Sequence, residues 1–437
     1  MYEEMLKEIG VSSIEELFSD IPKEVREGLN LPPPKSEMEV MQEAEKILSK
    51  NKKVINFAGC GVYTHYIPSA VIEIASRSEF YTSYTPYQPE ISQGILQALF
   101  EYQSFMAELT GMDFANSSMY DFSTSLGEAA RMCYRINGKK KFLIPERIYW
   151  EKESVLKNYV WGLGMEILKY PMKKGKMDLD SLAEMVDNDT SGVYVEIPNF
   201  YGVIDENVTK VKDILENKSL LVVGVNPLSL AVLKPPGEYG ADIVIGEGQI
   251  LGNPPNFGGP LLGIFATKEE YARKMPGRII GMTKDSDDKR AFCMILQTRE
   301  QHIRRKRATS NICTNEALCA VMSAVYIAIL GRSGLRKLAL KNMEMARKLA
   351  EKIDSLHSFT APKFGPIFNE FVATFPHNPY KIQEYLISRG INIGPPLPKE
   401  CFPELENNGM LLAATEMNTE EEIDYFANVL REYGGDE

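Results

Sequence analysis

The first 55 residues carry short helical patterns and no apolar run long enough to form a domain core. Ser13 and Ser36 are each followed three residues later by a glutamate, Glu16 and Glu39, which is the capping box that starts a helix. After Ser36, apolar residues recur with the 3.6-residue period of an amphipathic helix. We therefore predict an N-terminal helical arm over residues 1–55. The apolar positions of its second helix are Val40, Met41, Ala44, Ile47 and Leu48.

Between about residues 115 and 267, short apolar runs alternate with amphipathic stretches. Most runs end at a glycine or a proline, the residues that follow strands at turns. This alternation predicts an α/β fold in which helices cover both faces of a mostly parallel sheet. Ligands of such sheets bind at the carboxyl ends of the strands. The predicted strands are residues 142–144, 193–197, 220–223, 242–245 and 261–266, with helices over 179–186 and 208–215 between them.

An apolar stretch over residues 315–330 follows, with Thr314 as its predicted cap and Gly331 as its end. About 16 residues are fewer than a bilayer-spanning helix needs, so we predict a buried core helix. A charged amphipathic helix over 335–356 comes next. The pattern predicts a large domain over residues 56–325 and a small C-terminal α+β domain over 326–437. The small domain would also hold strands near 371–375 and 411–414 and helices over 379–389 and 420–433.

The composition is that of a mildly acidic enzyme, with 437 residues, 44% hydrophobic residues and a net charge of −11. This charge argues against a nucleic-acid partner, because phosphate binding needs clustered surplus Lys and Arg. We expect a cytoplasmic protein without a membrane segment, since neither a signal peptide nor a spanning run is visible. Four histidines and six cysteines without zinc spacing argue against a metal site. We expect reduced cysteines, with Cys313 and Cys319 in the core.

Residues 80–97 hold the densest group of tyrosine and amide side chains in the chain. Tyr84, Tyr87, Gln88 and Glu90 lie among prolines, so a rigid loop would present fixed hydrogen-bonding groups at low entropic cost. The alternative is a proline-stiffened connector with ordinary surface residues. The pattern alone leaves both interpretations open.

The strongest basic run is Arg304–Arg307, within residues 297–315. The planar fork of arginine suits a carboxylate or a phosphate, so the run indicates a substrate carboxylate, a phosphate or an acidic partner protein. A solvated charged face is the ordinary alternative.

Residues 116–118, Asn-Ser-Ser, precede a small-residue stretch, where an anion site at a helix start and simple N-capping are both possible. His65 is interpreted as a packed, hydrogen-bonded residue.

Several longer motifs occur in order along the chain. They are GCGVYTH at 59–65, YTPYQ at 84–88, FEYQ at 100–103, ELTGM at 108–112, and REQHIRR at 299–305 followed by ATSN at 308–311. Over about residues 1–430 the chain resembles the P-protein family of the glycine cleavage system, glycine decarboxylase. Its length resembles the separate N-terminal half, or alpha subunit, of the two-gene form. The resemblance implies a type I pyridoxal phosphate transferase-like fold with a mostly parallel seven-stranded-type sheet. It also implies decarboxylation of glycine and transfer of the aminomethyl group to the lipoyl arm of the H-protein.

The family's catalytic half has a lysine that binds pyridoxal phosphate in a Gly-rich loop and an aspartate in an Asp-Gly-Ala-Asn stretch. The matching loop here, Gly246–Gly263, contains no lysine, and the matching strand end reads Val223–Asn226, with valine in place of aspartate. Both residues are needed for the cofactor's electron-sink chemistry. The resemblance therefore implies that the cofactor lies on a partner beta subunit and not covalently on this chain.

Active sites of this fold lie at subunit interfaces, so the resemblance implies that this chain contributes residues to the partner's site. Its candidates are Tyr84, Tyr87, Gln88, Glu90, Arg299, His302 and Arg304. A vestigial cofactor region is expected at Asn116, Ser117, Val223, Asn226 and Gln249.

Two other functions remain open from the sequence. One is a stand-alone pyridoxal phosphate enzyme that uses another lysine, such as Lys234 or Lys268. The other is a purely structural or regulatory subunit, in which the candidate residues would not affect turnover.

Overall fold

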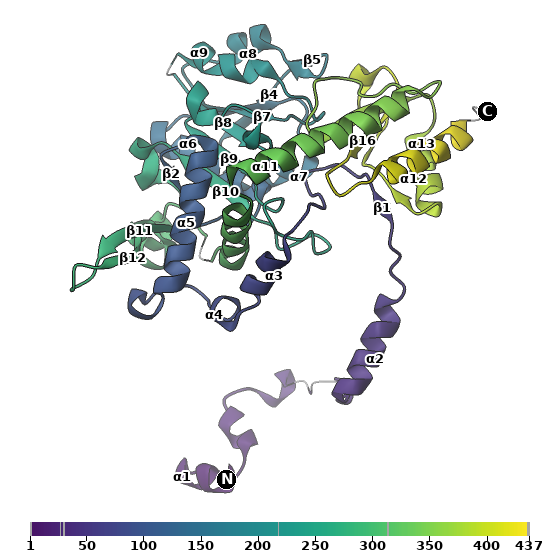
Figure 1. The fold of residues 1–437 in the computed structure, drawn as a ribbon. Coiled ribbons are helices and arrows are strands. Elements are labelled where there is room, and N and C mark those ends of the chain that lie inside the picture. The colour runs from purple at the N-terminus through teal and green to yellow at the C-terminus, as the bar shows by residue number, and fades with distance from the viewer. Residues whose placement is uncertain (1, 27, 29–30, 217, 313, 435–437) are drawn as a thin grey trace. The chain divides into compact units, whose positions relative to one another are not determined.

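The computed structural model describes residues 2–26, 28, 31–216, 218–312 and 314–434 of the chain (Figure 1). The chain divides into two compact units, Met1–Lys53 and Val54–Glu437. Each unit is described by itself.

Across its described residues, the first unit contains only short helices. The capping box predicted at Ser36 is confirmed, because the Ser36 N–H donates to Glu39 Oε2 at 2.8 Å and the Glu39 N–H donates to Ser36 Oγ at 3.4 Å. The box predicted at Ser13 is wrong. Glu16 instead accepts from the Ser12 N–H at 2.9 Å, and the segment that follows Ser13 is a 3-10 helix of 5 residues without a side-chain cap. The elements are α1 (Tyr2–Glu8), η1 (Ile14–Phe18), η2 (Lys23–Val25) and α2 (Glu37–Leu48), and none of their described residues is buried.

A seven-stranded sheet forms the centre of the second unit, in the order β2-β10-β9-β8-β7-β3-β4. The five strands from β9 to β4 are parallel, and β10 runs antiparallel to both of its neighbours. The predicted mostly parallel sheet is therefore confirmed. The strands are β2 (Phe114–Ala115), β3 (Lys141–Pro145), β4 (Glu166–Tyr170), β7 (Thr190–Ile197), β8 (Leu220–Val225), β9 (Ile243–Glu247) and β10 (Gly263–Thr267).

Helices cover both faces of this sheet, so the strands are apolar on both sides. Alternate residues of β7 show the division, since Val193 and Val195 join one apolar cluster and Tyr194 joins another. The first cluster includes residues of α5 and α11, and the second includes residues of α6 and α7. These helices and their smaller neighbours are α3 (Ser69–Ala75), α4 (Ser78–Tyr81), α5 (Gln93–Thr110), α6 (Phe122–Asn137), α7 (Trp150–Trp161), α8 (Leu179–Met185), α9 (Val211–Leu215), α10 (Gln301–Arg304) and α11 (Ala317–Asp354).

A smaller sheet lies toward the C-terminal end, in the order β13-β16-β15. A separate parallel pair joins β1 to β14, with Ile55 beside Ile391. Residues of the second half of α11, α12 and α13 share one apolar cluster with these strands. The elements are β1 (Ile55–Asn56), β13 (Glu370–Phe375), α12 (Pro379–Ser388), β14 (Ile391–Asn392), β15 (Pro396–Leu397), β16 (Asn408–Ala413) and α13 (Glu420–Gly434), together with the two hairpins β5 (Met172–Lys173)–β6 (Lys176–Met177) and β11 (Ile279–Lys284)–β12 (Arg290–Ile295).

The long helix α11 departs from the prediction at its start, whereas the predicted break at Gly331 between two helical segments is confirmed. It begins at Ala317 with Glu316 at the cap position, not at Asn315 after Thr314. Gly331 is non-helical, but the helix resumes at once, because glycine absorbs the break without a loop. By length and composition this helix could cross a membrane, yet half of its most apolar window is buried inside the protein, as in a core helix. Cys319 is buried in it, whereas Cys313 lies outside the described residues.

Gly331→Ala is expected to destabilise the protein by about 1–3 kcal/mol. Gly331 has φ 58° and ψ −178°, a region that only glycine occupies readily, and no atom lies within 4 Å of an added Cβ. The cost would therefore come from the backbone alone. Chemical unfolding measures it, with Gly94→Ala as the matched control. Gly94 lies in the first turn of α5, equally open and without a positive φ, so its substitution should be neutral or slightly stabilising. Equal effects of the two variants would contradict the prediction.

Candidate functional site

A small polar cleft lies where the parallel strands end, which is the place where this architecture binds ligands. Glu196, Asn226 and Glu247 enter it from the ends of β7, β8 and β9, and Phe122 enters from the start of α6. The small sheet contributes Glu370 from β13. The remaining lining residues are Gly61, Tyr63, Tyr149, Lys152, Pro198, Asn199, Val225, Ile250 and Asn369.

The cleft is largely filled by its own charged side chains. Lys152 Nζ lies 2.5 Å from Glu196 Oε1, and both side chains are at most 7% exposed. The same ammonium lies 3.6 Å from the centre of the Phe122 ring and 4.7 Å from that of Tyr149, so it has two cation–π contacts. This lysine is not predicted from the sequence, because no motif marks it and Glu196 is 44 positions away.

Glu370 forms the wall of the cleft on the side of the small sheet. Its carboxylate accepts from the Tyr149 hydroxyl at 2.5 Å and from the Cys60 N–H. Burial raises the pKa of Glu370 to about 7, although hydrogen bonds from Tyr149, Cys60 and Tyr63 favour the charged form.

Glu370→Gln is expected to remove a fall in stability that the wild type shows between about pH 4.5 and pH 7. Below its ordinary pKa of 4.5 the carboxyl is protonated in both states, and its contribution is fully present. As the pH rises through the folded pKa of about 7, the folded protein must hold a buried charge, which costs up to about 3 kcal/mol. Unfolding free energies of both proteins at pH 5 and pH 7.5 test this. Glu416→Gln is a control with the opposite pH dependence of stability, because the pKa of Glu416 is lowered in the folded protein and its contribution is lost as the pH falls. Burial would raise the pKa of Glu416, but its hydrogen bond with His65 and the charge of His65 lower it.

The cleft does not fit pyridoxal phosphate. Its volume is about 50 Å³, room for a few water molecules, whereas pockets for organic ligands begin at about 300 Å³. Lys152 is held in its ion pair by Glu196. Val223, expected in place of the cofactor's aspartate, is fully buried within the core of β8, and Val225 lines the cleft instead.

Two of the other expected vestigial residues hold the loops beside this cleft. Asn226 Oδ1 accepts from the N–H groups of Leu228 at 3.1 Å and Ser229 at 3.3 Å. Gln249 accepts from the Tyr63 N–H at 3.2 Å and donates to the Tyr63 carbonyl at 3.1 Å. Asn116 and Ser117 neither line the cleft nor hold the loops beside it. Asn116 Nδ2 donates to the Pro276 carbonyl at 3.1 Å, and the Ser117 N–H donates to the Arg278 carbonyl at 2.8 Å.

A second cluster brings together segments that the sequence analysis had singled out separately. The buried guanidinium of Arg278 donates to Thr85 Oγ1 at 3.0 Å and to the Tyr87 hydroxyl at 3.2 Å. Its Nε lies 3.8 Å from Glu300 Oε2, and the His302 ring packs edge-on against Tyr87 at 6.1 Å. Arg278 and Glu300 therefore connect the loop of Tyr87 to the segment of His302, and neither was among the candidates.

The remaining candidates of that surface differ in exposure and contacts. Tyr84 is 67% exposed, with its hydroxyl 2.9 Å from Thr314 Oγ1, and Gln88 and Glu90 are also exposed. Arg304 is exposed, with Nε donating to the Thr298 carbonyl at 2.9 Å. Arg299 points inward instead and donates to the carbonyls of Met275 and Gly277. Burial lowers the pKa of its guanidinium to about 10. Its two contacts with backbone carbonyls are those of a structural residue.

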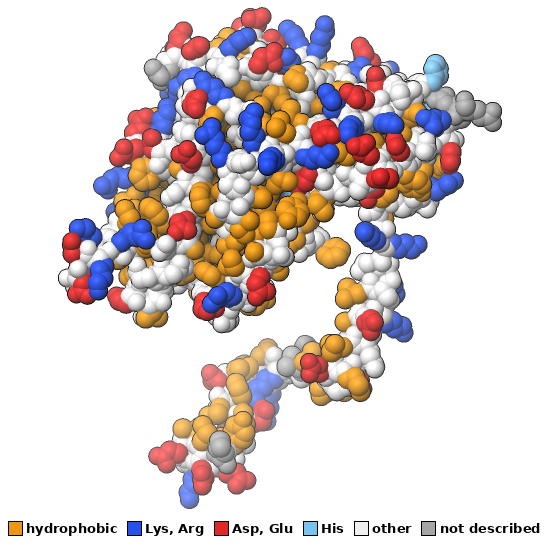
Figure 2. All heavy atoms as spheres, viewed as in Figure 1, with side chains coloured by type: hydrophobic (Ala, Val, Ile, Leu, Met, Phe, Trp, Pro, Cys, Tyr) orange, Lys and Arg blue, Asp and Glu red, His pale blue; other side chains and the backbone are white. Residues whose placement is uncertain are grey.

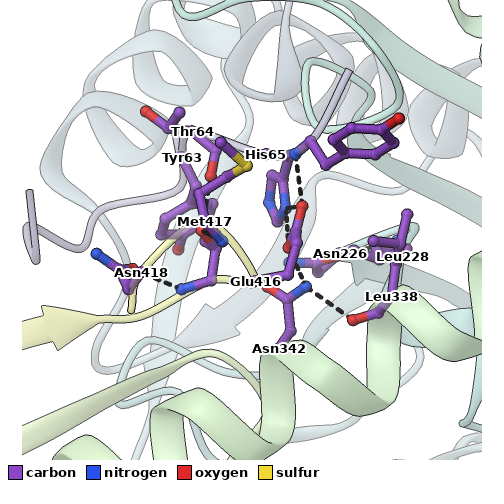
Figure 3. Close-up of polar contacts among 12 residues, drawn as sticks. Tyr63, Thr64, His65, Asn226, Leu228, Leu338, Asn342, Glu416, Met417 and Asn418 are labelled. Carbon is purple, nitrogen blue, oxygen red and sulfur yellow. Dashed lines mark hydrogen bonds and ion pairs between the residues drawn. The ribbon is translucent and has the colours of Figure 1, made fainter. Parts of the chain in front are cut away.

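His65 is a packed and hydrogen-bonded residue, as predicted. Its Nδ1 lies 3.2 and 3.1 Å from the two carboxylate oxygens of Glu416, which also accepts from Asn342 Nδ2 and from the Tyr66 N–H. Figure 3 shows these side chains converging from the segment around His65, from α11 and from the loop after β16. The network thus connects the segment around His65, α11 and the loop after β16.

The two lysines considered for a stand-alone enzyme lie away from the cleft. Lys234 is 56% exposed and lies 4.0 Å from Glu238. Lys268 lies 2.5 Å from the buried Asp242, which Lys212 also contacts at 2.7 Å. Among the described residues, no group of three His, Cys, Asp or Glu side chains is arranged to hold a metal ion.

The chain matches proteins of one family over nearly its whole length. Residues 2–430 match the family described as Glycine cleavage system P-protein. A probable glycine dehydrogenase (decarboxylating) subunit 1 of Thermoplasma volcanium is 50% identical over 98% of both chains. The protein of the same description from Pyrococcus furiosus is also 50% identical, over 98% of this chain and 97% of its own.

Solved structures agree with this match. A crystal structure of glycine decarboxylase (P-protein) of the glycine cleavage system, in inhibitor-bound form, superposes with a TM-score of 0.92 at 40% identity, covering 98% of this chain and 97% of that one. A sphingosine-1-phosphate lyase from Burkholderia pseudomallei shares the fold alone, with a TM-score of 0.67 at 12% identity, over 96% of this chain and 94% of its own. The predicted type I pyridoxal phosphate transferase-like fold is confirmed.

Proposed function

This chain belongs to the glycine cleavage system P-protein family, as subunit 1 of a two-subunit glycine dehydrogenase (decarboxylating), and we propose that it completes an active site whose cofactor is held by the partner subunit. The single observation that carries the proposal is the cleft at the strand ends. It has the right place for a cofactor, but its own side chains fill it and its loop has no lysine.

The proposed cofactor is pyridoxal phosphate on the partner beta subunit. When bound, it supplies an electron sink for the carbanion that loss of carbon dioxide from glycine leaves behind. The residues of this chain would bind and orient groups around that site. The aminomethyl group would pass to the lipoyl arm of the H-protein.

The surface proposed to face the partner's site is the Arg278 cluster, defined as Thr85, Tyr87, Arg278, Glu300 and His302. The loop that carries Thr85 and Tyr87 is held by the two hydrogen bonds of Arg278, so the exposed side of Tyr87 has a fixed position. Fixed aromatic groups lose little conformational freedom on contact with a partner or substrate. The neighbouring Tyr84, Gln88 and Glu90 are exposed on the same loop. Arg304 and the exposed basic residues that follow suit a carboxylate or an acidic partner such as the proposed H-protein.

Two apolar surfaces support a partner subunit. The helix α2 exposes Val40, Met41, Ile47 and Leu48, and none of its residues is buried. A groove of about 880 Å³ lies between α5 and α11, lined by apolar residues such as Phe105, and Figure 2 shows hydrophobic side chains gathered in that region. Large exposed apolar patches mark protein interfaces, and we assign both surfaces to the beta subunit. The other apolar lining residues of the groove are Leu109, Leu230, Val232, Leu233, Ile327 and Leu335.

The test is to mix this chain with its beta subunit and pyridoxal phosphate, record the absorbance, reduce with borohydride and map the modified lysine by mass. We expect the cofactor to be fixed on the partner alone, and glycine–carbon dioxide exchange to exceed that of the partner alone. Fixation on a lysine of this chain, including Lys152, would overturn the proposal and support a stand-alone enzyme. Absence of any gain in exchange would support a structural or regulatory subunit.

A further inference from the structure

The start of α6 holds a carboxylate from the chain itself. Glu247, at the end of β9, accepts three backbone hydrogen bonds: from Leu262 at 2.8 Å and Gln249 at 3.0 Å on Oε1, and from Phe122 at 3.1 Å on Oε2. Phe122 is the first residue of α6, a helix of 16 residues. The carboxylate is therefore bound by N–H groups of one helix start and of the loop after β9.

Three backbone donors on one buried carboxylate are the pattern of a bound anion. The N-terminus of a helix carries partial positive charge and free N–H groups, and phosphate groups bind there in α/β folds. The place is also the carboxyl end of the strands, where such folds bind their ligands. Glu247 is 7% exposed, so water does not compete for these donors.

We propose that Glu247 is a built-in substitute for a ligand phosphate, which closes an anion site that this fold would otherwise offer at the start of α6. Lys152 completes the closure, because its ammonium lies against the Phe122 ring and pairs with Glu196 in the same cleft. The inference rests on the proposed function in one respect, that the cofactor is held by another chain. It explains how the fold stays intact without the cofactor. Glu247 accepts from the backbone donors that a phosphate would otherwise occupy, and side chains of this chain fill the space.

The capping residue Asp121 does not perform this role. Its Oδ1 accepts from the Thr124 N–H at 2.7 Å, an ordinary cap within α6. Glu247 instead comes from a different element and takes the Phe122 N–H, which Asp121 leaves available. Burial raises the pKa of Glu247 to about 7, against the three backbone hydrogen bonds that favour its charged form. The start of α6 thus holds a carboxylate whose burial is costly.

The test compares the full-length wild type with Glu247→Ala and Glu247→Gln, using inorganic phosphate as the probe and chloride at equal ionic strength as the reference. Alanine opens the site, so phosphate should raise the melting temperature of that variant saturably at millimolar concentration. Glutamine keeps the volume filled and one acceptor oxygen, so neither it nor the wild type should respond beyond chloride.

Two outcomes would overturn the proposal. One is a folded Glu247→Ala variant that does not respond to phosphate, and the other is an equal response of all three proteins. If the alanine variant does not fold in chloride, its refolding yield in phosphate replaces the melting measurement: rescue supports the proposal and no rescue contradicts it. The readout does not involve cofactor attachment, so a failure here is distinguishable from a lysine of this chain binding the cofactor.

Discussion

Arg278→Met is expected to lower turnover of the two-subunit enzyme by about a hundredfold while the subunits still assemble. Arg278 holds Thr85 and Tyr87 through separate nitrogen atoms, and its charge lies beside Glu300. Methionine fills a similar space but cannot form the hydrogen bonds that hold the loop of Thr85 and Tyr87. Displacement of positioned groups by about 1 Å costs about 10²-fold in rate. Steady-state kinetics with saturating beta subunit, together with size-exclusion chromatography, measures both parts of the expectation.

The matched control is Arg147→Met. Arg147 forms a comparable network, with Nη2 donating to Glu404 at 2.7 Å and the guanidinium 4.8 Å from the Phe402 ring, but it is not part of the Arg278 cluster. Its replacement should leave turnover within about twofold. Arg278→Lys should lie between the two, because a single ammonium cannot reproduce the fork. Unchanged turnover in Arg278→Met would support a purely structural subunit and contradict the shared site.

Glu196→Ala is expected to destabilise the chain by about 3–5 kcal/mol. The variant leaves the Lys152 ammonium, whose side chain is only 5% exposed, without the carboxylate that lies 2.5 Å from it in the wild type. Breaking a buried pair by removing one partner is costly because an uncompensated charge remains. The cation–π contacts with Phe122 and Tyr149 offset only part of this loss. Chemical unfolding at neutral pH measures the difference.

The double variant Lys152→Met/Glu196→Met separates this cause from a simple loss of packing. Replacing both charges by apolar side chains removes the desolvation cost together with the pair, so most of the lost stability should return. A double variant as unstable as Glu196→Ala would show that the cleft needs the ions themselves. In that case the pair would be a stabilising feature and not merely a filled space.

The sequence predicted the fold better than the site, for physical reasons. The central strands of the large sheet are apolar on both faces, so short runs such as 193–197 are visible in the sequence without any tertiary information. The hairpin of β11 and β12 was missed because its outer half is exposed and charged, with none of the apolar continuity of the central strands.

The site depends on contacts between residues far apart in the chain. Tyr87 and His302 were proposed from their own segments, but Arg278, which connects them, stands in no motif. Glu247 meets the helix start at Phe122 across 125 positions, and no spacing rule reveals that distance. Arg299 is a candidate because it belongs to the motif at 299–305, yet its guanidinium donates to backbone carbonyls inside the protein.

The pairing of β1 with β14 sets the order in which the protein can finish folding during synthesis. Ile55 lies beside Ile391, and the fully buried Phe57 packs against Phe426 of α13 with ring centres 5.1 Å apart. The partners of this early segment, β14 and α13, are synthesised much later than the segment itself. The large sheet can assemble on the nascent chain, but residues 55–57 remain uncovered until the final helix emerges. Completion of the small sheet's core therefore follows assembly of the large sheet, and a chain truncated before α13 would keep an exposed aromatic surface open to aggregation.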